Sequence, residues 1–346
     1  MKRGMRFAAV LLALTLFLSG AALAEGENSQ RVSFLLMCNE GMNNDGGNVG
    51  NTLMNVSFDA ETGEIRLLMF TWDTFITVEG YDVPQLLDQP YRDNGPEGTL
   101  KAYNSNFGQS IDKFLSINYL NLANLIDQFG GVNVDISRAE RNALNGMVAS
   151  KKKSITTMAN IGQLEQMLVD SLADEYFLDQ WGEDTHLNGL QAVGFGWLQY
   201  DSVYNCCLRE GKVISDLFAS VENTLNEQVV FYTDDSGAPA GDNRRAINLD
   251  HLTKEDLDEL YRHIKPIFVK SYNNLTQTEV YIITAAFGRA AYEAARQGVD
   301  VFRNVECAIL PLEATAPYDV VAGREGHLVD TAANAKAITD FLYGED

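Results

Sequence analysis

Short apolar runs alternate with segments of helical spacing in the first half of the chain, and this order most restricts its fold. Runs rich in β-branched and aromatic residues predict buried strands at 31–38, 52–58, 64–70, 114–118 and 132–136. A turn at 59–63 separates the second and third strands, and residues 71–83 continue as strand and turn. Helical patterns predict helices at 97–109 and 120–129. Strands that alternate with helices indicate an α/β fold.

The second half of the chain is more helical and more polar. Residues 138–186 have helical character, with an exposed loop at Lys151–Lys153. A turn-rich insertion is expected at 234–244, and a helix that Thr253 caps follows it. Further elements are predicted as helices at 192–199, 210–225, 275–295 and 331–343, and as a strand at 306–310.

The first residues resemble an export signal. Lys2, Arg3 and Arg6 precede the apolar run 7–18, which is too short to cross a bilayer comfortably, and residues 22–24 offer a small-residue cleavage site. We therefore expect a signal peptide at 1–24, with an uncleaved anchor as the alternative. No later segment predicts a transmembrane helix. The mature chain is expected outside the cytoplasm, secreted or at the cell envelope near a membrane surface.

The charge of the chain excludes one class of partner. Lys and Arg number 26 against 48 Asp and Glu, which gives a formal net charge of −22. A surface of this sign repels nucleic acid, so we expect no nucleic-acid partner.

Cysteine and histidine positions do not predict a metal site. Four cysteines leave three possible connectivities, and a vicinal Cys206–Cys207 bond would be strained. We expect Cys38 to pair with Cys206 or Cys207, and Cys307 is a further candidate for a disulfide; buried free thiols are the alternative. Metal binding is disfavoured because no CxxC spacing is present. The histidines are scattered in the sequence and are expected at the surface: His186, His251, His263 and His327.

Several collinear motifs resemble the LytR–CpsA–Psr (LCP) family of bacterial cell-envelope proteins. They are the strand FLLMC with a Gly/Asn loop, the hairpin DAETGEIRLLMFTWDTFI, the segment FGGVNVDI at 129–136 and LNGLQAVGF at 187–195. The resemblance extends over residues 31–346. It implies one domain at 25–346, with a core at about 31–226 and a C-terminal extension at about 245–346.

The resemblance also implies a fold and an activity. The fold is a three-layer α/β/α sandwich around a central mixed sheet. The activity is transfer of a polyprenyl-pyrophosphate-linked glycopolymer to peptidoglycan, so the expected partner is that glycopolymer or another cell-wall component. The lipid requires an apolar tunnel between sheet and helices. The pyrophosphate requires arginines and Mg²⁺ held by carboxylates.

The chain departs from the family pattern where charge is needed. Asn39 and Asn51 occupy the positions of the family's acidic metal ligands, so Mg²⁺ binding should be weak or absent. Trp72, Trp197 and Gln199 stand where the family has arginines, and Cys206 replaces a further one. The two tryptophans are expected to pack together and fill the pocket, with sugar stacking as the alternative.

Few family site residues remain. Asp73 and Arg209 are the candidate catalytic residues, with a capping role for Asp73 and a surface position for Arg209 as the alternatives. Thr52 and Asp201 join Trp72, Trp197 and Gln199 as candidate ligand-binding residues. Three hypotheses follow: a catalytically impaired member, or pseudoenzyme, that retains a binding role; a structural or regulatory exported protein; and an active phosphotransferase with an altered site.

Overall fold

A computed structural model describes residues 31–39, 49–147, 149, 177–298, 305–312 and 316–344, and only the backbone of residues 49–51. The predicted signal peptide and the loop at Lys151–Lys153 lie outside these ranges. In the described part of the chain, no helix is both long and apolar enough to cross a membrane.

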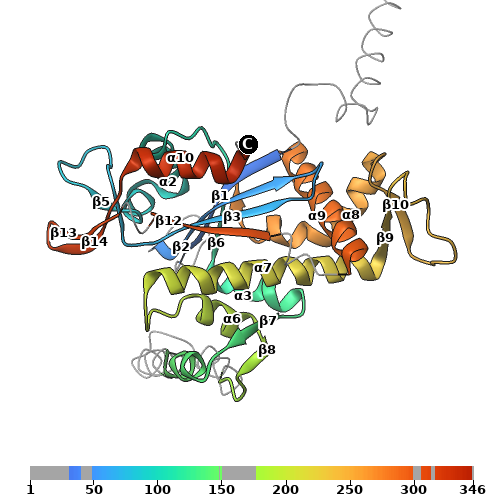
Figure 1. The fold of residues 1–346 in the computed structure, drawn as a ribbon, viewed down its shortest axis with the longest axis horizontal. Coiled ribbons are helices and arrows are strands. Elements are labelled where there is room, and N and C mark those ends of the chain that lie inside the picture. The colour runs from blue at the N-terminus through green and yellow to red at the C-terminus, as the bar shows by residue number, and fades with distance from the viewer. Residues whose placement is uncertain are drawn as a thin grey trace, which may run out of the picture.

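A mixed six-stranded sheet forms the centre of the molecule (Figure 1). Its strand order is β11-β6-β1-β2-β3-β12. The bounds are β11 (Tyr272–Asn273), β6 (Phe114–Asn118), β1 (Arg31–Asn39), β2 (Val49–Asp59), β3 (Ile65–Phe70) and β12 (Val305–Leu310). β1, β2 and β3 pair antiparallel, whereas β6 and β12 join parallel to β1 and β3. Two strands of the sheet, β11 and β12, therefore come from the C-terminal part of the chain.

Helices cover both faces of the sheet, as the three-layer prediction requires. One face packs on α2 (Gln89–Phe107) and α10 (Thr331–Tyr343). The other packs on α3 (Tyr119–Gln128), α6 (Gly189–Gly196), α7 (Val203–Gln228), α8 (Lys254–Val269) and α9 (Gln277–Gln297). Alternating residues of β1 divide between these two cores: Phe34 and Cys38 belong to the α7 side, and Leu35 and Met37 to the α2 side.

Three smaller sheets lie at the edges of the molecule. β7 (Val132–Ile136) pairs antiparallel with β8 (Gly182–Leu187), and β9 (Val229–Tyr232) pairs parallel with β10 (Arg245–Asn248). The third sheet has the order β13-β14-β4-β5, from β13 (Tyr318–Val321), β14 (Arg324–Leu328), β4 (Thr74–Ile76) and β5 (Gln85–Leu86). The parallel pairing of β14 with β4 brings residues near 327 beside residues near 74.

Two arginines connect the central sheet with the last helix of the described structure. Arg31 on β1 donates to the carbonyl oxygen of Leu342 at 3.0 Å, and Arg66 on β3 donates to that of Phe341 at 2.7 Å. Both carbonyls lie in the last turn of α10, where helical carbonyls lack intrahelical partners. The end of α10 is thereby held against β1 and β3.

The structure confirms most predicted elements and corrects others. Capping boxes at Asn188, Thr253 and Thr276 start α6, α8 and α9. α2 begins at Gln89, well before the predicted residue 97, and kinks at Asn94 and Gly95. Residues 138–186 were expected to have helical character; residues 138–147 are helical, but Gly182–Leu187 form β8. The edge strands β13 and β14 were not predicted.

Candidate functional site

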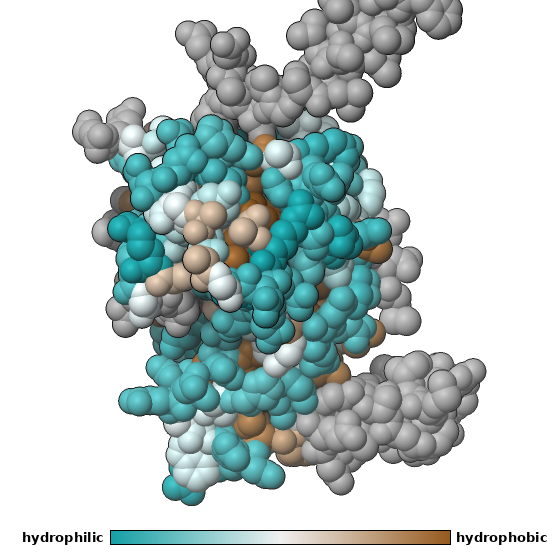
Figure 2. Space-filling model, turned by 90° about the vertical axis from the view of Figure 1, so that its right-hand side faces the viewer, coloured by the Kyte–Doolittle hydropathy of each residue, from teal (hydrophilic) through white to brown (hydrophobic). Residues whose placement is uncertain are grey.

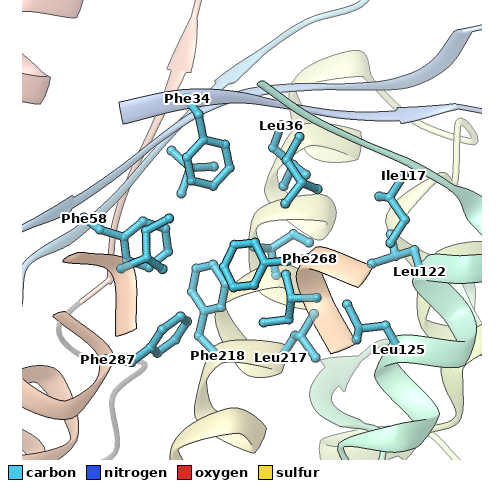
Figure 3. Close-up of a pocket in the computed structure, with 15 residues that line it drawn as sticks. Phe34, Leu36, Phe58, Ile117, Leu122, Leu125, Leu217, Phe218, Phe268 and Phe287 are labelled. Atoms are coloured by element: carbon cyan, nitrogen blue, oxygen red, sulfur yellow. The ribbon is translucent and has the colours of Figure 1, made fainter. Parts of the chain in front are cut away.

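An apolar pocket lies between the central sheet and the helices of the α7 side (Figure 3). The empty space between its walls amounts to about 580 Å³, a volume that includes space open to solvent. Every lining residue is aliphatic or aromatic: Phe34, Leu36, Val56, Phe58, Leu115, Ile117, Leu122, Leu125, Ile214, Leu217, Phe218, Ile267, Phe268, Ile283 and Phe287. The pocket therefore suits a hydrocarbon ligand.

Period-two alternation in the strands creates this lining. Phe34 and Leu36 on β1 and Val56 and Phe58 on β2 project from the same face of the sheet. At one side of the pocket, the rings of Phe58, Phe218 and Phe287 pack together with centroid distances of 5.3–5.7 Å (Figure 3). On the face of the molecule shown in Figure 2, hydrophilic residues predominate, and hydrophobic residues appear between them in several places.

A buried polar network lies where β2 meets α6 and α7. The indole Nε1 of Trp197 donates to the Thr52 hydroxyl at 3.0 Å, and this hydroxyl donates to Oε1 of Glu210 at 2.8 Å. Thr52 and Glu210 are both buried. Two of the predicted ligand-binding residues, Thr52 and Trp197, therefore meet in the structure. The aromatic partner of Trp197 is Tyr119, at a centroid distance of 6.1 Å.

Glu210 is a buried acid that the sequence did not mark as a site residue. Burial raises the pKa of Glu210 well above its ordinary value, while the Thr52 hydrogen bond and the nearby charge of Arg209 lower it by less. The carboxyl group is therefore held toward its neutral form. The only signal available in the sequence was an acidic residue directly after Arg209.

Arg209 is buried rather than on the surface, and both terminal nitrogens of its guanidinium are engaged, while its Nε has no hydrogen-bond partner among the described residues. Its guanidinium donates to both carboxylate oxygens of Asp201, at 3.0 and 2.8 Å, and to the carbonyl of Leu198. Glu140 lies 3.6 Å away, and the ring of Tyr200 lies 5.2 Å from the guanidinium carbon. The Arg209 hydrogen bond lowers the pKa of Asp201 to about 2. The positive charge of Arg209 is thus satisfied within the protein.

Asp73 has other contacts than Arg209 and lies near the C-terminal strand β14. Its side chain is buried, its Oδ2 lies 3.9 Å from Nε2 of His327, and its Oδ1 has no hydrogen-bond partner in the described structure. Burial raises the pKa of Asp73, and the charge of His327 and a hydrogen bond with Thr71 oppose that rise. The neighbouring Trp72 is half-buried, and its indole N–H also lacks a partner among the described residues.

The structure corrects several expectations for these residues. Neither Trp72 nor Trp197 lines the apolar pocket, and ring contacts in the described structure do not include the predicted Trp72–Trp197 pair. Gln199 is exposed. The surface prediction for the histidines was wrong for two of them, because His263 and His327 are partly buried, with side-chain exposures of 21% and 12%.

The two amide positions do not form a carboxylate site for Mg²⁺. Asn39 is fully buried on the α2 side, where its amide nitrogen donates to Tyr91 at 3.0 Å and to Ser116 at 3.3 Å. Thr52 faces the opposite side of the sheet, toward α7. The side chain of Asn51 lies outside the described structure. Within the described residues, no group of three or more His, Cys, Asp or Glu side chains could hold a metal ion.

The predicted disulfide is not formed, and the cysteines of the described structure are thiols. Cys206 donates through its Sγ to the carbonyl of Gly196, at 3.3 Å, and Cys207 to that of Phe70, at 3.6 Å. Consecutive residues of α7 direct these two thiols to different carbonyl acceptors. Burial raises the pKa of Cys206 to about 12, which disfavours its thiolate.

Comparisons with known proteins agree with this architecture. TagV from B. subtilis aligns with a TM-score of 0.56 and 11% identity over 92% of this chain and all of TagV. The protein gbs0355 from Streptococcus agalactiae aligns with a TM-score of 0.57 and 15% identity, over 91% of this chain and 89% of its own. B. subtilis TagT, in its structure bound to LI-WTA, aligns with a TM-score of 0.53 and 13% identity, over 92% of this chain and 98% of its own. Identities this low establish the fold alone.

The sequence itself carries the family relationship. The profile of the LytR_cpsA_psr family matches residues 18–202, more than half of the chain. The match ends before Cys206 and Arg209, so it is shorter than the resemblance at 31–346. No curated protein sequence is significantly similar to the chain. The chain belongs to the LytR–CpsA–Psr family of cell-envelope proteins, whose members act in glycopolymer metabolism of the envelope.

Proposed function

We propose that this protein is exported, binds the polyprenyl part of a lipid-linked envelope glycopolymer, and transfers that polymer weakly or not at all. The observation that carries the proposal is the combination of an intact apolar pocket with an arginine, Arg209, that is already neutralised by Asp201. The apolar pocket suits a lipid, while the Arg209 guanidinium that would bind a pyrophosphate is engaged by Asp201.

The pocket supports the lipid part of the proposal. Burial of apolar surface contributes about 25 cal/mol per Å², or about 0.8 kcal/mol for each CH₂ group, so a long isoprenoid chain gains affinity without charged contacts. The aliphatic and aromatic lining offers no polar group that would select against hydrocarbon.

The engagement of Arg209 supports weak transfer. A pyrophosphate would have to compete with the bidentate carboxylate of Asp201 and with Glu140 for the guanidinium. Each charge-assisted hydrogen bond contributes about 1.5–3 kcal/mol, so exchanging these partners gains little. With Asn39 engaged by Tyr91 and Ser116, we also propose that Mg²⁺ binds weakly or not at all.

A matched pair of variants on α3 tests the lipid site. Leu122 lines the pocket and is half-buried, so Leu122→Lys places a charge in the apolar lining. We expect at least about tenfold weaker binding of a polyprenyl pyrophosphate, which corresponds to about 1.4 kcal/mol. Leu120→Lys is the control, because Leu120 is exposed on the same helix and does not line the pocket. Binding would be measured by calorimetry on the chain from Glu25.

The same protein distinguishes the remaining hypotheses. Transfer to peptidoglycan would be assayed with and without Mg²⁺, and clear Mg²⁺-dependent transfer would refute the impaired-site proposal in favour of an active phosphotransferase. Equal lipid binding by Leu120→Lys and Leu122→Lys would refute the pocket. Failure of the unaltered protein to bind the lipid would favour a structural or regulatory role that retains only the fold.

A further inference from the structure

His327 reaches Asp73 from a distant part of the sequence through the edge sheet. β14 pairs with β4, and the backbone N–H of His327 donates to the carbonyl oxygen of Asp73 at 2.8 Å. The approach is close at the preceding residue as well, because a Cβ on Gly326 would lie 2.2 Å from that same oxygen. Strand pairing and a glycine thus fix the imidazole beside the Asp73 carboxylate.

The hydrogen bonds of the imidazole fix its tautomer. Nδ1 of His327 lies 2.9 Å from the carbonyl oxygen of Ala316. A carbonyl only accepts, so Nδ1 must carry the proton of this bond. In the neutral ring, Nε2 then presents a lone pair to Oδ2 of Asp73, 3.9 Å away. Two acceptors face each other unless one proton resides on the imidazole or on the carboxyl group.

Other side chains hold the ring in place and limit water access. Tyr204 of α7 and Tyr318 of β13 pack edge-on against the imidazole, with centroid distances of 5.6 and 5.1 Å. The Tyr204 hydroxyl is itself fixed by the carbonyl of Pro311 at 2.8 Å. Near the carboxylate are Thr71, which hydrogen-bonds to it, and the Cys207 thiol, which interacts with it electrostatically. The side chains of Asp73 and His327 are only 3% and 12% exposed.

We propose that His327 is a positioning residue for Asp73: the imidazole, held by Ala316 and by the pairing of β14 with β4, lies 3.9 Å from Oδ2 and acts on the carboxylate through its charge, beyond the distance of a hydrogen bond. Oδ1 is buried and has no hydrogen-bond partner among the described residues. The inference goes beyond the proposed function and does not rest on it, because the contact itself requires no ligand.

The tautomer provides a direct test on the unaltered protein. We expect long-range ¹H–¹⁵N spectra at high pH to show His327 protonated at Nδ1, with the signal assigned by its loss in His327→Gln. The tautomer is read from the native chain, and the variant serves only to assign the signal. A neutral His327 protonated at Nε2 would overturn the proposal.

The carboxyl group provides the second test. His327 lowers the pKa of Asp73, so His327→Gln should shift the pKa of Asp73 further upward, as followed by the ¹³Cγ signal. His251→Gln is the control, because His251 forms a comparable but exposed pair with Asp234 at 2.9 Å; it should leave Asp73 unchanged. An identical Asp73 titration in His327→Gln and the unaltered protein would also overturn the proposal. Neither outcome depends on lipid binding, so failure here is distinct from failure of the proposed function.

Discussion

At the residue scale, the candidate site contains two buried acidic side chains. Glu210 and Asp73 both sit in environments where burial is the largest influence on the pKa and raises it. Arg209, the nearest cation to Glu210, gives its direct contacts to Asp201 instead. Such an arrangement favours proton uptake over binding of a multiply charged anion.

Glu210 should therefore make stability fall as the pH rises. The pKa of Glu210 is higher in the folded protein than in the unfolded chain. At pH values between these two pKa values the folded state binds more protons than the unfolded state, so stability is lost as the pH rises through this range. Glu210→Gln keeps an acceptor for Thr52 and cannot ionise. We expect its melting temperature to exceed that of the unaltered protein at neutral pH and to match it more closely at acid pH.

Thermal unfolding monitored by circular dichroism across this pH range would measure the effect. Glu227→Gln is the matched control, because Glu227 is exposed on the same helix. A melting-temperature difference for Glu210→Gln that does not change with pH would contradict the titration argument.

The residue scale also shows what the sequence could reveal of the site. Thr52 and Trp197 were predicted as site residues because both lie in segments that resemble the family's motifs. The structure brings the two side chains into contact. His327 could not be predicted, since its contact with Asp73 spans about 250 positions and depends on a parallel pairing of two short strands. Arg209 was expected as either functional or exposed; its buried pairing with Asp201 required the geometry of α7.

At the element scale, apolar patterning determined which segments the sequence revealed. β1, β2, β3 and β6 are buried on two faces and carry strong apolar runs. β8, β13 and β14 are largely exposed and polar, so their sequences lack the alternation that predicts a strand. Edge strands of this kind are recognised by their partners in space rather than by their composition.

The contact between α3 and α6 gives a prediction at this scale. A Cβ on Gly189 would lie 1.9 Å from the carbonyl oxygen of Ala123, a backbone atom that cannot rotate away. Gly189→Ala should therefore separate the two helices and destabilise the protein by about 1–3 kcal/mol, as overpacking does. Denaturant unfolding would measure the loss.

Gly146 provides the control for this substitution. It is also helical, but an added Cβ would meet nothing within 4 Å. Gly146→Ala should be neutral or should stabilise the protein by up to about 1 kcal/mol, because alanine has the higher helix propensity. Similar free energies of unfolding for the two variants would show that the α3–α6 approach is looser than the structure has it.

At the scale of the whole molecule, the central sheet depends on the C-terminal part of the chain. β12 pairs with all six residues of β3, and α10 completes the core on the α2 side. We expect a chain truncated after residue 298 to lose cooperative thermal unfolding in calorimetry, whereas truncation after residue 344 should leave it intact. A cooperative transition in the shorter chain would show that residues 31–298 fold without this part.

The arginine contacts at the end of α10 also bear on the order in which the molecule can form. Arg31, at the start of β1, bonds to a carbonyl that lies 311 positions later in the chain. During synthesis, β1 and β3 are therefore made long before these carbonyl acceptors exist, and only nearby acids such as Glu64 can pair with the two guanidinium ions until then. The native arrangement can close only after α10 has emerged, so a nascent chain must remain open at this edge.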